Sequence, residues 1–172
     1  MKKTTLLFPM LAALALPAVA QDEKKVESVA KIFPEKLENA KGEEVSHDVL
    51  TDKIVAIYFS AHWCPPCRAF TPSLVEFHKK NKGDDFEIVF VSFDNSEAEK
   101  AKYISEVGME WLSVAGNRSD VGNALGQKYG VRGIPALVVL APDGSVITKE
   151  GRADVSGNAD GALAKWKKEV EG

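Results

Sequence analysis

The segment Ala61-His62-Trp63-Cys64-Pro65-Pro66-Cys67-Arg68 contains both cysteines of the 172-residue chain, with two residues between them. It directly follows the apolar run from Ile54 to Ser60, whose β-branched and aromatic content predicts a buried parallel strand. A Cys-x-x-Cys pair where a strand gives way to a helix is typical of proteins in which one thiolate attacks a disulfide and the other releases the mixed intermediate. The segment therefore predicts thiol–disulfide exchange at Cys64 and Cys67, without a bound cofactor or metal.

Other roles for a cysteine pair are weaker but remain open. A structural disulfide gains stability by closing a long loop, and this one would enclose only two residues. Structural zinc needs about four ligands, and besides the two cysteines the chain offers only His47, His62 and His78. A Cu(I) site on the two thiolates, with His62 close in sequence, is the alternative from a different class, although no distal His or Met cluster supplies a third ligand. A copper-binding protein or metallochaperone would use the same two thiolates.

The N-terminal sequence predicts export. A basic Lys2-Lys3 pair is followed by an apolar run from Leu6 to Leu16 and by the small-residue site Ala18-Val19-Ala20. This order is that of a secretory signal peptide, here residues 1–20, and the run is too short for a spanning helix of about 20 residues. We expect a periplasmic or secreted protein that is soluble after cleavage. Exported proteins that use disulfides for stability usually contain several of them. Because both cysteines of this chain lie in one short motif, a redox role is favoured over a structural one.

Composition limits the other classes of partner. The chain has 22 basic and 25 acidic side chains, for a formal net charge of −3. Lysine and glutamate are interspersed along it, so neither a nucleic-acid-binding stripe nor an acidic tail is present. No extended apolar interface stripe is evident, which predicts a monomer.

The remaining pattern predicts one α/β domain over residues 34–172, after a polar lead-in at 21–33. A Lys41-Gly42 turn predicts a small N-terminal hairpin, and Pro72 is expected to kink or end a first helical segment. Strand segments are expected at 54–60, 86–93, 136–140 and 146–149 with a short one at 111–114, and helices after Cys64 and at about 96–107, 119–129 and 158–170.

Within the motif the two cysteines have different expected roles. Cys64 lies at a helix N-terminus, where unpaired N–H groups and the helix dipole favour the thiolate, so it is the expected nucleophile. Cys67 lies one turn further in, is less exposed, and is expected to resolve the mixed disulfide. Pro65 and Pro66 stiffen the turn between them and limit the number of N–H donors that can stabilise the Cys64 thiolate.

The segment Trp63-Cys64-Pro65-Pro66-Cys67, followed much later by Val131-Arg132-Gly133-Ile134-Pro135 and a strand, resembles the thioredoxin superfamily. The stretch from Tyr58 to Pro72, together with Val91-Ser92-Phe93-Asp94, is similar to its tryparedoxin and nucleoredoxin branch, and exported cytochrome-maturation-type thioredoxins share much of the same plan. The resemblance implies a thioredoxin-like fold, with a central mixed β-sheet flanked by helices and a small N-terminal hairpin extension.

The resemblance also implies site residues. Pro135 would be a cis-proline that faces the cysteine pair and keeps metal away from the thiols. The backbone of Ile134 would pair with the substrate peptide, and Trp63, with Pro65 and Pro66, would shape the docking surface. An ordinary aromatic lid over the core is the alternative for Trp63.

One position departs from the family. Thioredoxins carry a buried aspartate six residues before the first cysteine, and that position here is Tyr58. A phenol with a pKa of about 10 is a poor base at neutral pH. Asp94 is a candidate proton acceptor, although an N-cap role at the next helix is the alternative. His62 either raises the thiolate population by its charge or is a solvated loop residue.

Taken together, these features predict an exported protein disulfide reductase. Its substrates would be exposed protein disulfides, such as those of an apocytochrome or a peroxidase. Because an oxidising compartment would keep the pair as a disulfide, a membrane thiol-electron donor is needed. A disulfide oxidase or isomerase is the alternative, because this fold supports both directions of exchange.

Overall fold

The structure, a computed structural model, describes residues 28–172; the predicted signal peptide and the start of the predicted lead-in lie outside them. The elements in chain order are the 3-10 turn η1 (Val29–Ile32), β1 (Lys36–Glu38), β2 (Glu44–Ser46), the 3-10 turn η2 (His47–Leu50), β3 (Ile54–Ser60), α1 (Pro65–Asn81), β4 (Phe86–Ser92), α2 (Glu97–Val107), β5 (Leu112–Ser113), α3 (Asp120–Tyr129), β6 (Ala136–Leu140), β7 (Val146–Thr148) and α4 (Gly151–Glu171).

The strands form one mixed sheet of seven, in the order β2-β1-β5-β4-β3-β6-β7. At its centre β3 pairs in parallel with β4 and antiparallel with β6, so β3 has a neighbour on each side. Every residue of β3 is buried, as its continuous apolar sequence predicts for an interior strand. The predicted α/β fold with a mixed sheet is therefore confirmed.

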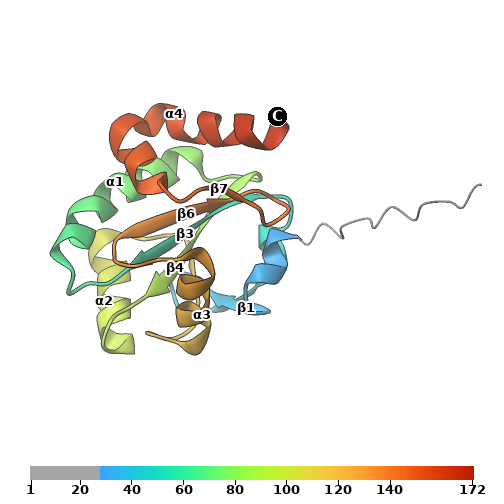
Figure 1. The fold of residues 1–172 in the computed structure, drawn as a ribbon. Coiled ribbons are helices and arrows are strands. Elements are labelled where there is room, and N and C mark those ends of the chain that lie inside the picture. The colour runs from blue at the N-terminus through green and yellow to red at the C-terminus, as the bar shows by residue number, and fades with distance from the viewer. Residues whose placement is uncertain (1–27) are drawn as a thin grey trace, which may run out of the picture.

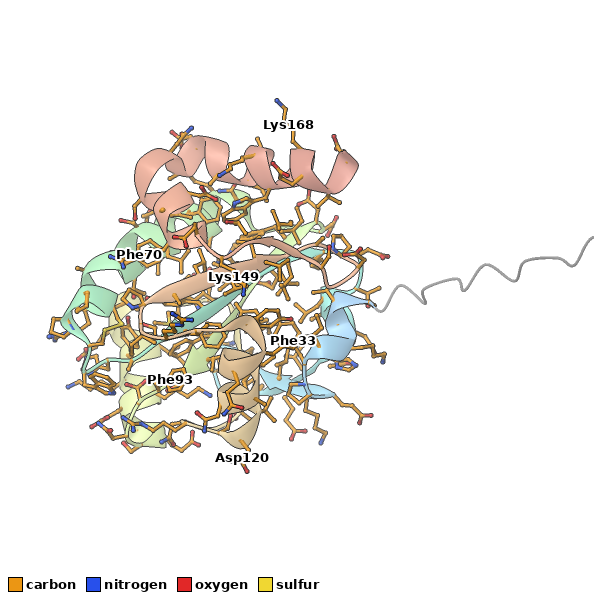
Figure 2. The ribbon with its side chains drawn as sticks, viewed as in Figure 1. Phe33, Phe70, Phe93, Asp120, Lys149 and Lys168 are labelled. Atoms are coloured by element: carbon orange, nitrogen blue, oxygen red, sulfur yellow. A yellow bond between two sulfur atoms is a disulfide. The ribbon has the colours of Figure 1, made fainter. Side chains whose placement is uncertain are left out.

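The two faces of the sheet carry different helices. Side chains alternate along β3, so Tyr58 packs in one cluster with residues of α1, α2 and α4. Its neighbours Ile57 and Phe59 pack in a second cluster with α3 and the 3-10 turns. Figure 1 shows α1 and α4 on one side of the sheet and α3 on the other. Phe70 of α1 and Phe33, which follows η1, belong to these opposite clusters (Figure 2).

The N-terminal hairpin is confirmed. Strands β1 and β2 pair antiparallel around a turn in which Gly42 has a φ of 78°, a left-handed value that glycine adopts without steric cost. Strand β1 also pairs antiparallel with β5, so the hairpin continues the main sheet.

The packed domain begins earlier than the expected boundary at residue 34. Val29, Ala30 and Phe33 are at most 4% exposed, and the Val29 amide donates to the carbonyl of Pro142 at 2.8 Å. The last residues of the predicted polar lead-in thus belong to the core, because a few apolar side chains among many charged ones are enough to fix a single 3-10 turn.

Two helices show how the expectations at Pro72 and at the C-terminus turned out. Helix α1 continues through Pro72 to Asn81, so the proline does not end a segment. Helix α4 begins at Gly151 instead of near residue 158, and its backbone leaves helical geometry at Asn158 (φ −156°, ψ 76°). The Asn158 side chain accepts from the amide of Gly161 at 3.2 Å and caps the second part of the helix, which is the part that the sequence predicted. Within residues 28–172, none of the helices has the length and apolar character needed to cross a membrane.

Candidate active site

Cys64 lies at the junction between the central strand and the first long helix. It is the N-cap residue of α1 in an extended conformation (φ −91°, ψ 107°), and its Sγ accepts a hydrogen bond from the Cys67 amide at 3.3 Å. Pro65 and Pro66 occupy the first helical turn, where a missing N–H costs no intrahelical bond. The sulfur of Cys64 therefore lies at the positive end of the α1 dipole, as the sequence predicted.

Cys64 and Cys67 are joined in a disulfide. Cys67 is fully buried and Cys64 is 3% exposed, and both pack against Ala61, Phe93 and Ile134. The second cysteine is thus the more enclosed of the two, in the order expected for a nucleophile and its resolving partner.

The loop that precedes β6 lies against the disulfide. Helix α3 ends at Tyr129, and its C-cap Gly130, with a φ of 69°, turns the chain toward this loop. The Ile134–Pro135 peptide bond is cis, as the resemblance implied, and the carbonyl oxygen of Ile134 lies 3.8 Å from Cys64 Sγ. The two motifs that are about 70 residues apart in sequence therefore meet at one site. The substrate-pairing role of Ile134 and the role of Pro135 stay predictions.

Trp63 lies at the surface beside the disulfide. It is 49% exposed, and its Nε1 donates to the carbonyl of Phe93 at 2.9 Å. The ring is thus half-exposed beside the disulfide, and its role in substrate docking stays a prediction. Pro65 and Pro66 are also exposed, and their contribution to substrate docking stays a prediction.

Tyr58, at the position of the family aspartate, belongs to a buried cluster of hydroxyl groups. Its OH lies 2.8 Å from Thr71 Oγ1, which also contacts Tyr103 OH, and Tyr103 OH lies 3.1 Å from Ser60 Oγ. Burial raises the pKa of Tyr58 above its usual value, so the phenol stays protonated and is not a base.

The protons of this cluster have one consistent arrangement. The Thr71 hydroxyl donates to the carbonyl oxygen of Cys67 at 2.8 Å, because that oxygen can only accept. Its single proton is then used, so Tyr58 and Tyr103 must both donate to it, and Ser60 must donate to Tyr103. The hydroxyl groups of β3 and α2 thus hold the first turn of α1 through the carbonyl of Cys67.

Asp94 holds the loop before Cys64. It is fully buried, one carboxylate oxygen accepts from the His62 amide at 2.6 Å, and the other accepts from Ser92 Oγ at 2.8 Å. The N-cap of α2 is Ser96, which accepts from the Glu99 amide, so the alternative role of Asp94 as the cap is wrong. Its role as a proton acceptor for Cys67 stays a prediction.

His62 is paired with a carboxylate. Its Nε2 lies 2.8 Å from Glu106 Oε2, and its side chain is only 19% exposed, so it is not a freely solvated loop residue. The hydrogen bond from His62 lowers the pKa of the Glu106 carboxyl. Nε2 of His62 is therefore paired with Glu106, whereas the copper alternative would require the His62 ring to face the two thiolates.

A groove of about 350 Å³ opens beside the cysteines. Its lining residues are Trp63, Phe93, Arg118, Val131, Arg132, Gly133 and Ile134. Trp63 and Ile134 were predicted as docking residues. Phe93 and Arg118 were not, because the loops that carry them approach Trp63 only through the order of strands in the sheet.

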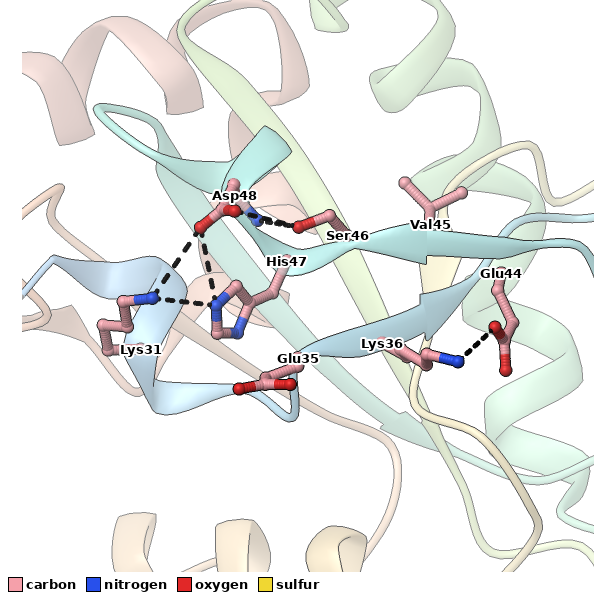
Figure 3. Close-up of a pocket in the computed structure, with 8 residues that line it drawn as sticks. All are labelled: Lys31, Glu35, Lys36, Glu44, Val45, Ser46, His47 and Asp48. Atoms are coloured by element: carbon pink, nitrogen blue, oxygen red, sulfur yellow. Dashed lines mark hydrogen bonds and ion pairs between the residues drawn. The ribbon is translucent and has the colours of Figure 1, made fainter.

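A second hollow, of about 420 Å³, lies at the N-terminal hairpin and includes neither cysteine (Figure 3). In it His47 Nδ1 donates to the carbonyl of Phe33 at 3.0 Å, while Nε2 lies 3.2 Å from Lys31 Nζ and 3.5 Å from Asp48 Oδ1. These contacts attach η1 to η2. The hollow therefore serves the fold and stands apart from the redox site. Across residues 28–172, no three His, Cys, Asp or Glu side chains are grouped so that they could hold a metal ion.

Comparison with known proteins identifies relatives of the same kind. A family model described as thioredoxin-like matches residues 52–146. Mouse nucleoredoxin is 44% identical over 127 residues, which are 73% of this chain and 29% of that protein. Tryparedoxin of Trypanosoma brucei brucei is 39% identical over 129 residues, which are 74% of this chain and 88% of that protein. The solved structure of Trypanosoma brucei tryparedoxin superposes with a TM-score of 0.70 and 37% identity, covering 80% of this chain and 96% of that one.

The matched segment therefore spans less than a third of the mouse nucleoredoxin and nearly all of the tryparedoxin. The chain belongs to the thioredoxin-like family, as a thiol–disulfide oxidoreductase of the tryparedoxin and nucleoredoxin type.

Proposed function

We propose that this oxidoreductase works as an exported, monomeric protein disulfide reductase. The observation that carries the direction is the number of donors to Cys64 Sγ. Of the three residues that follow Cys64, only Cys67 has an N–H, and it donates to Cys64 Sγ at 3.3 Å. A strongly oxidising pair has a highly stabilised reduced form, and a thiolate with one backbone donor is stabilised less.

The reaction balances on the two cysteines alone. The Cys64 thiolate attacks one sulfur of a substrate disulfide, forms a mixed disulfide and releases the first substrate thiolate. Cys67 loses its proton, attacks Cys64 Sγ and releases the second. Two electrons pass from the enzyme dithiol to the substrate, and the enzyme is left with the Cys64–Cys67 disulfide. A dithiol donor, which we propose to be a membrane thiol transporter, must then reduce it.

The reduction potential of the pair tests the direction. The purified protein without residues 1–20 would be equilibrated in thiol buffers, and its free thiols would be counted. A midpoint near or below about −200 mV supports the reductase, whereas one near about −120 mV would show an oxidant and overturn the proposed direction.

The substrates and the compartment need a separate test. We propose exposed protein disulfides, for example those of an apocytochrome or a peroxidase, as substrates. A Cys67→Ser variant cannot resolve its mixed disulfide, so it should accumulate covalent adducts that a Cys64→Ser variant does not form. Adducts recovered from the exported fraction, on a protein that begins at Gln21, would support the proposal; adducts confined to the cytoplasm would contradict export.

A further inference from the structure

The groove beside the disulfide carries positive charge without a matching carboxylate. Its two ionisable lining residues are Arg118 and Arg132, while the rest of the lining is apolar or glycine. The whole chain has a net charge of −3, so this basic groove contrasts with the molecule that surrounds it. A charged groove beside the disulfide can select among disulfide substrates only if the protein reduces them, so this inference rests on the proposed function.

Arg118 is held in place against Trp63. Its Nε donates at 3.0 Å to the carbonyl of Phe93, the same oxygen that accepts from Trp63 Nε1, and its guanidinium carbon lies 5.9 Å from the centre of the Trp63 ring. A terminal nitrogen of Arg118 donates to Asn95 Oδ1 at 2.8 Å. A cation over an indole face is attracted by the ring quadrupole, so Arg118 and Trp63 form one fixed wall of the groove.

This position of Arg118 is imposed by its backbone. Its φ of 45° is left-handed, which is uncommon for a residue with a Cβ, and its amide donates to the Ser92 carbonyl at 2.8 Å. Two of the five guanidinium N–H groups are used in the contacts to Phe93 and Asn95. In the described part of the chain no residue accepts from the other three, so they are available to an acceptor that enters the groove.

Arg132 provides the second charge, on the loop that leads to the cis peptide bond. It is exposed, and among residues 28–172 it forms no ion pair. The adjacent Gly133 leaves open space, because a Cβ there would meet no atom within 4 Å. Ile134 follows, and its carbonyl lies 3.8 Å from Cys64 Sγ. A chain that reaches the reactive sulfur from this side therefore passes both arginines.

The acidic groups near the groove have other partners. Asp94 is buried, with both carboxylate oxygens bound by His62 and Ser92. Glu99 accepts from the Asn95 amide at 3.0 Å. The guanidinium groups are thus not neutralised by these neighbours, and a carboxylate from a partner would meet uncompensated positive charge.

We propose that the groove selects protein disulfides whose cysteines are flanked by acidic residues, with carboxylates placed against Arg118 and Arg132 and apolar side chains on Trp63 and Phe93. Exposed charge pairs each change affinity by up to about five-fold, so two of them should give a preference of about ten- to twenty-fold for acidic over basic flanks.

The test uses three disulfide-linked peptide dimers of equal length, in which the cysteine is flanked by glutamate, by glutamine or by lysine. Each reacts with the reduced protein, and tryptophan fluorescence follows the formation of the Cys64–Cys67 disulfide. Each rate constant is divided by that of dithiothreitol with the same dimer, because neighbouring charges alter the reactivity of a disulfide. We expect the order glutamate, glutamine, lysine, with the differences reduced several-fold between about 0.05 and 0.5 M salt.

The Arg132→Gln variant should reduce the ratio of the glutamate to the glutamine rate by about three- to five-fold. The matched control is Lys128→Gln, on the exposed face of α3 beside Tyr129 and outside the groove, which should leave all three rates unchanged. Equal normalised rates, a preference for lysine, or a glutamate preference that Arg132→Gln leaves intact would overturn the acidic selectivity. If the reduced protein reduced none of the three dimers, the reductase function itself would be overturned, and the selectivity with it.

Discussion

Replacing Thr71 by valine tests whether the buried hydroxyl cluster supports the active-site turn. Valine keeps the branched shape but removes the oxygen that donates to the Cys67 carbonyl and accepts from Tyr58 and Tyr103. Thr71, Tyr58 and Tyr103 are all fully buried, so water cannot replace the lost partner without entering the core. Tyr103 can reverse its hydrogen bond and donate to Ser60 at 3.1 Å, whereas Tyr58 loses the acceptor of its hydroxyl proton.

The expected cost follows from that difference. One lost hydrogen bond to the Cys67 carbonyl contributes about 1 kcal/mol, and an unpaired buried phenol adds about 1–3 kcal/mol. The free energy of unfolding should therefore fall by about 2–4 kcal/mol, which lowers Tm by about 5–15 °C in a domain of this size. Tyr58→Phe should cost only about 1 kcal/mol, because it removes a donor and leaves Thr71 paired with Cys67 and Tyr103.

Urea unfolding of the oxidised protein, followed by tryptophan fluorescence, measures these values. Thr71→Ser serves as the control, because it keeps the hydroxyl and removes only a methyl group, for about 1 kcal/mol. If Thr71→Val lay within about 0.5 kcal/mol of the wild type, or cost less than Tyr58→Phe, the proton arrangement assigned to the cluster would be refuted.

Three further predictions concern stability, and each is read from unfolding curves. Lys100 is 3% exposed and bonds Glu38 at 2.7 Å, so Lys100→Met should lower the free energy of unfolding by about 2–3 kcal/mol; a loss below 1 kcal/mol would contradict a stabilising link between α2 and the hairpin. Gly151→Ala places a Cβ 2.9 Å from a carbonyl oxygen of β6 and should lower the free energy of unfolding by about 1–3 kcal/mol. Gly157→Ala in the same helix meets no atom within 4 Å and should raise it by about 0.5–1 kcal/mol, so equal effects would refute the packing assigned to Gly151. Burial alone would raise the pKa of Asp154, but hydrogen bonds from a lysine and a tryptophan of α4 lower it. This carboxylate therefore stabilises the fold above its unfolded pKa of about 3.9, and the contribution disappears as the pH falls through the lower folded value. Asp154→Asn should thus flatten the loss of stability between about pH 5 and 2, and an unchanged pH profile would contradict this pairing.

Local signals predicted the parts of the fold that depend on local physics. The apolar run at Ile54–Ser60 predicted the central strand, and the Lys41-Gly42 turn predicted the hairpin. The helix start at Cys64 followed from two prolines, which suit a first helical turn. The start of α4 was missed because Gly151 and Gly157 weaken helix propensity, while packing of the helix against β6 and α1 offsets that cost.

Signals at the site divide in the same way. Cys64 and Cys67 were identified by their residue type and spacing, whereas Pro135 was singled out only by the resemblance to the thioredoxin superfamily. Arg118 has no such signature. It becomes part of the site because β4 and β5 are adjacent in the sheet, which brings its loop to the carbonyl of Phe93 beside Trp63. Pairing of strands far apart in sequence decides such contacts, and a local pattern does not contain it.

The substitution at Tyr58 shows why a departure from a family pattern needs its surroundings to be understood. An aspartate at this position could accept a proton, but a fully buried phenol whose pKa is raised by burial keeps its own. The hydroxyl protons all run toward the carbonyl of Cys67, and none of these groups is free to accept a proton from its sulfur. Tyr58 is therefore a neutral, structural residue at the position where thioredoxins carry an aspartate that can titrate. The pH dependence of the attack by Cys67 should follow the thiol, without the influence of a buried carboxylate at position 58.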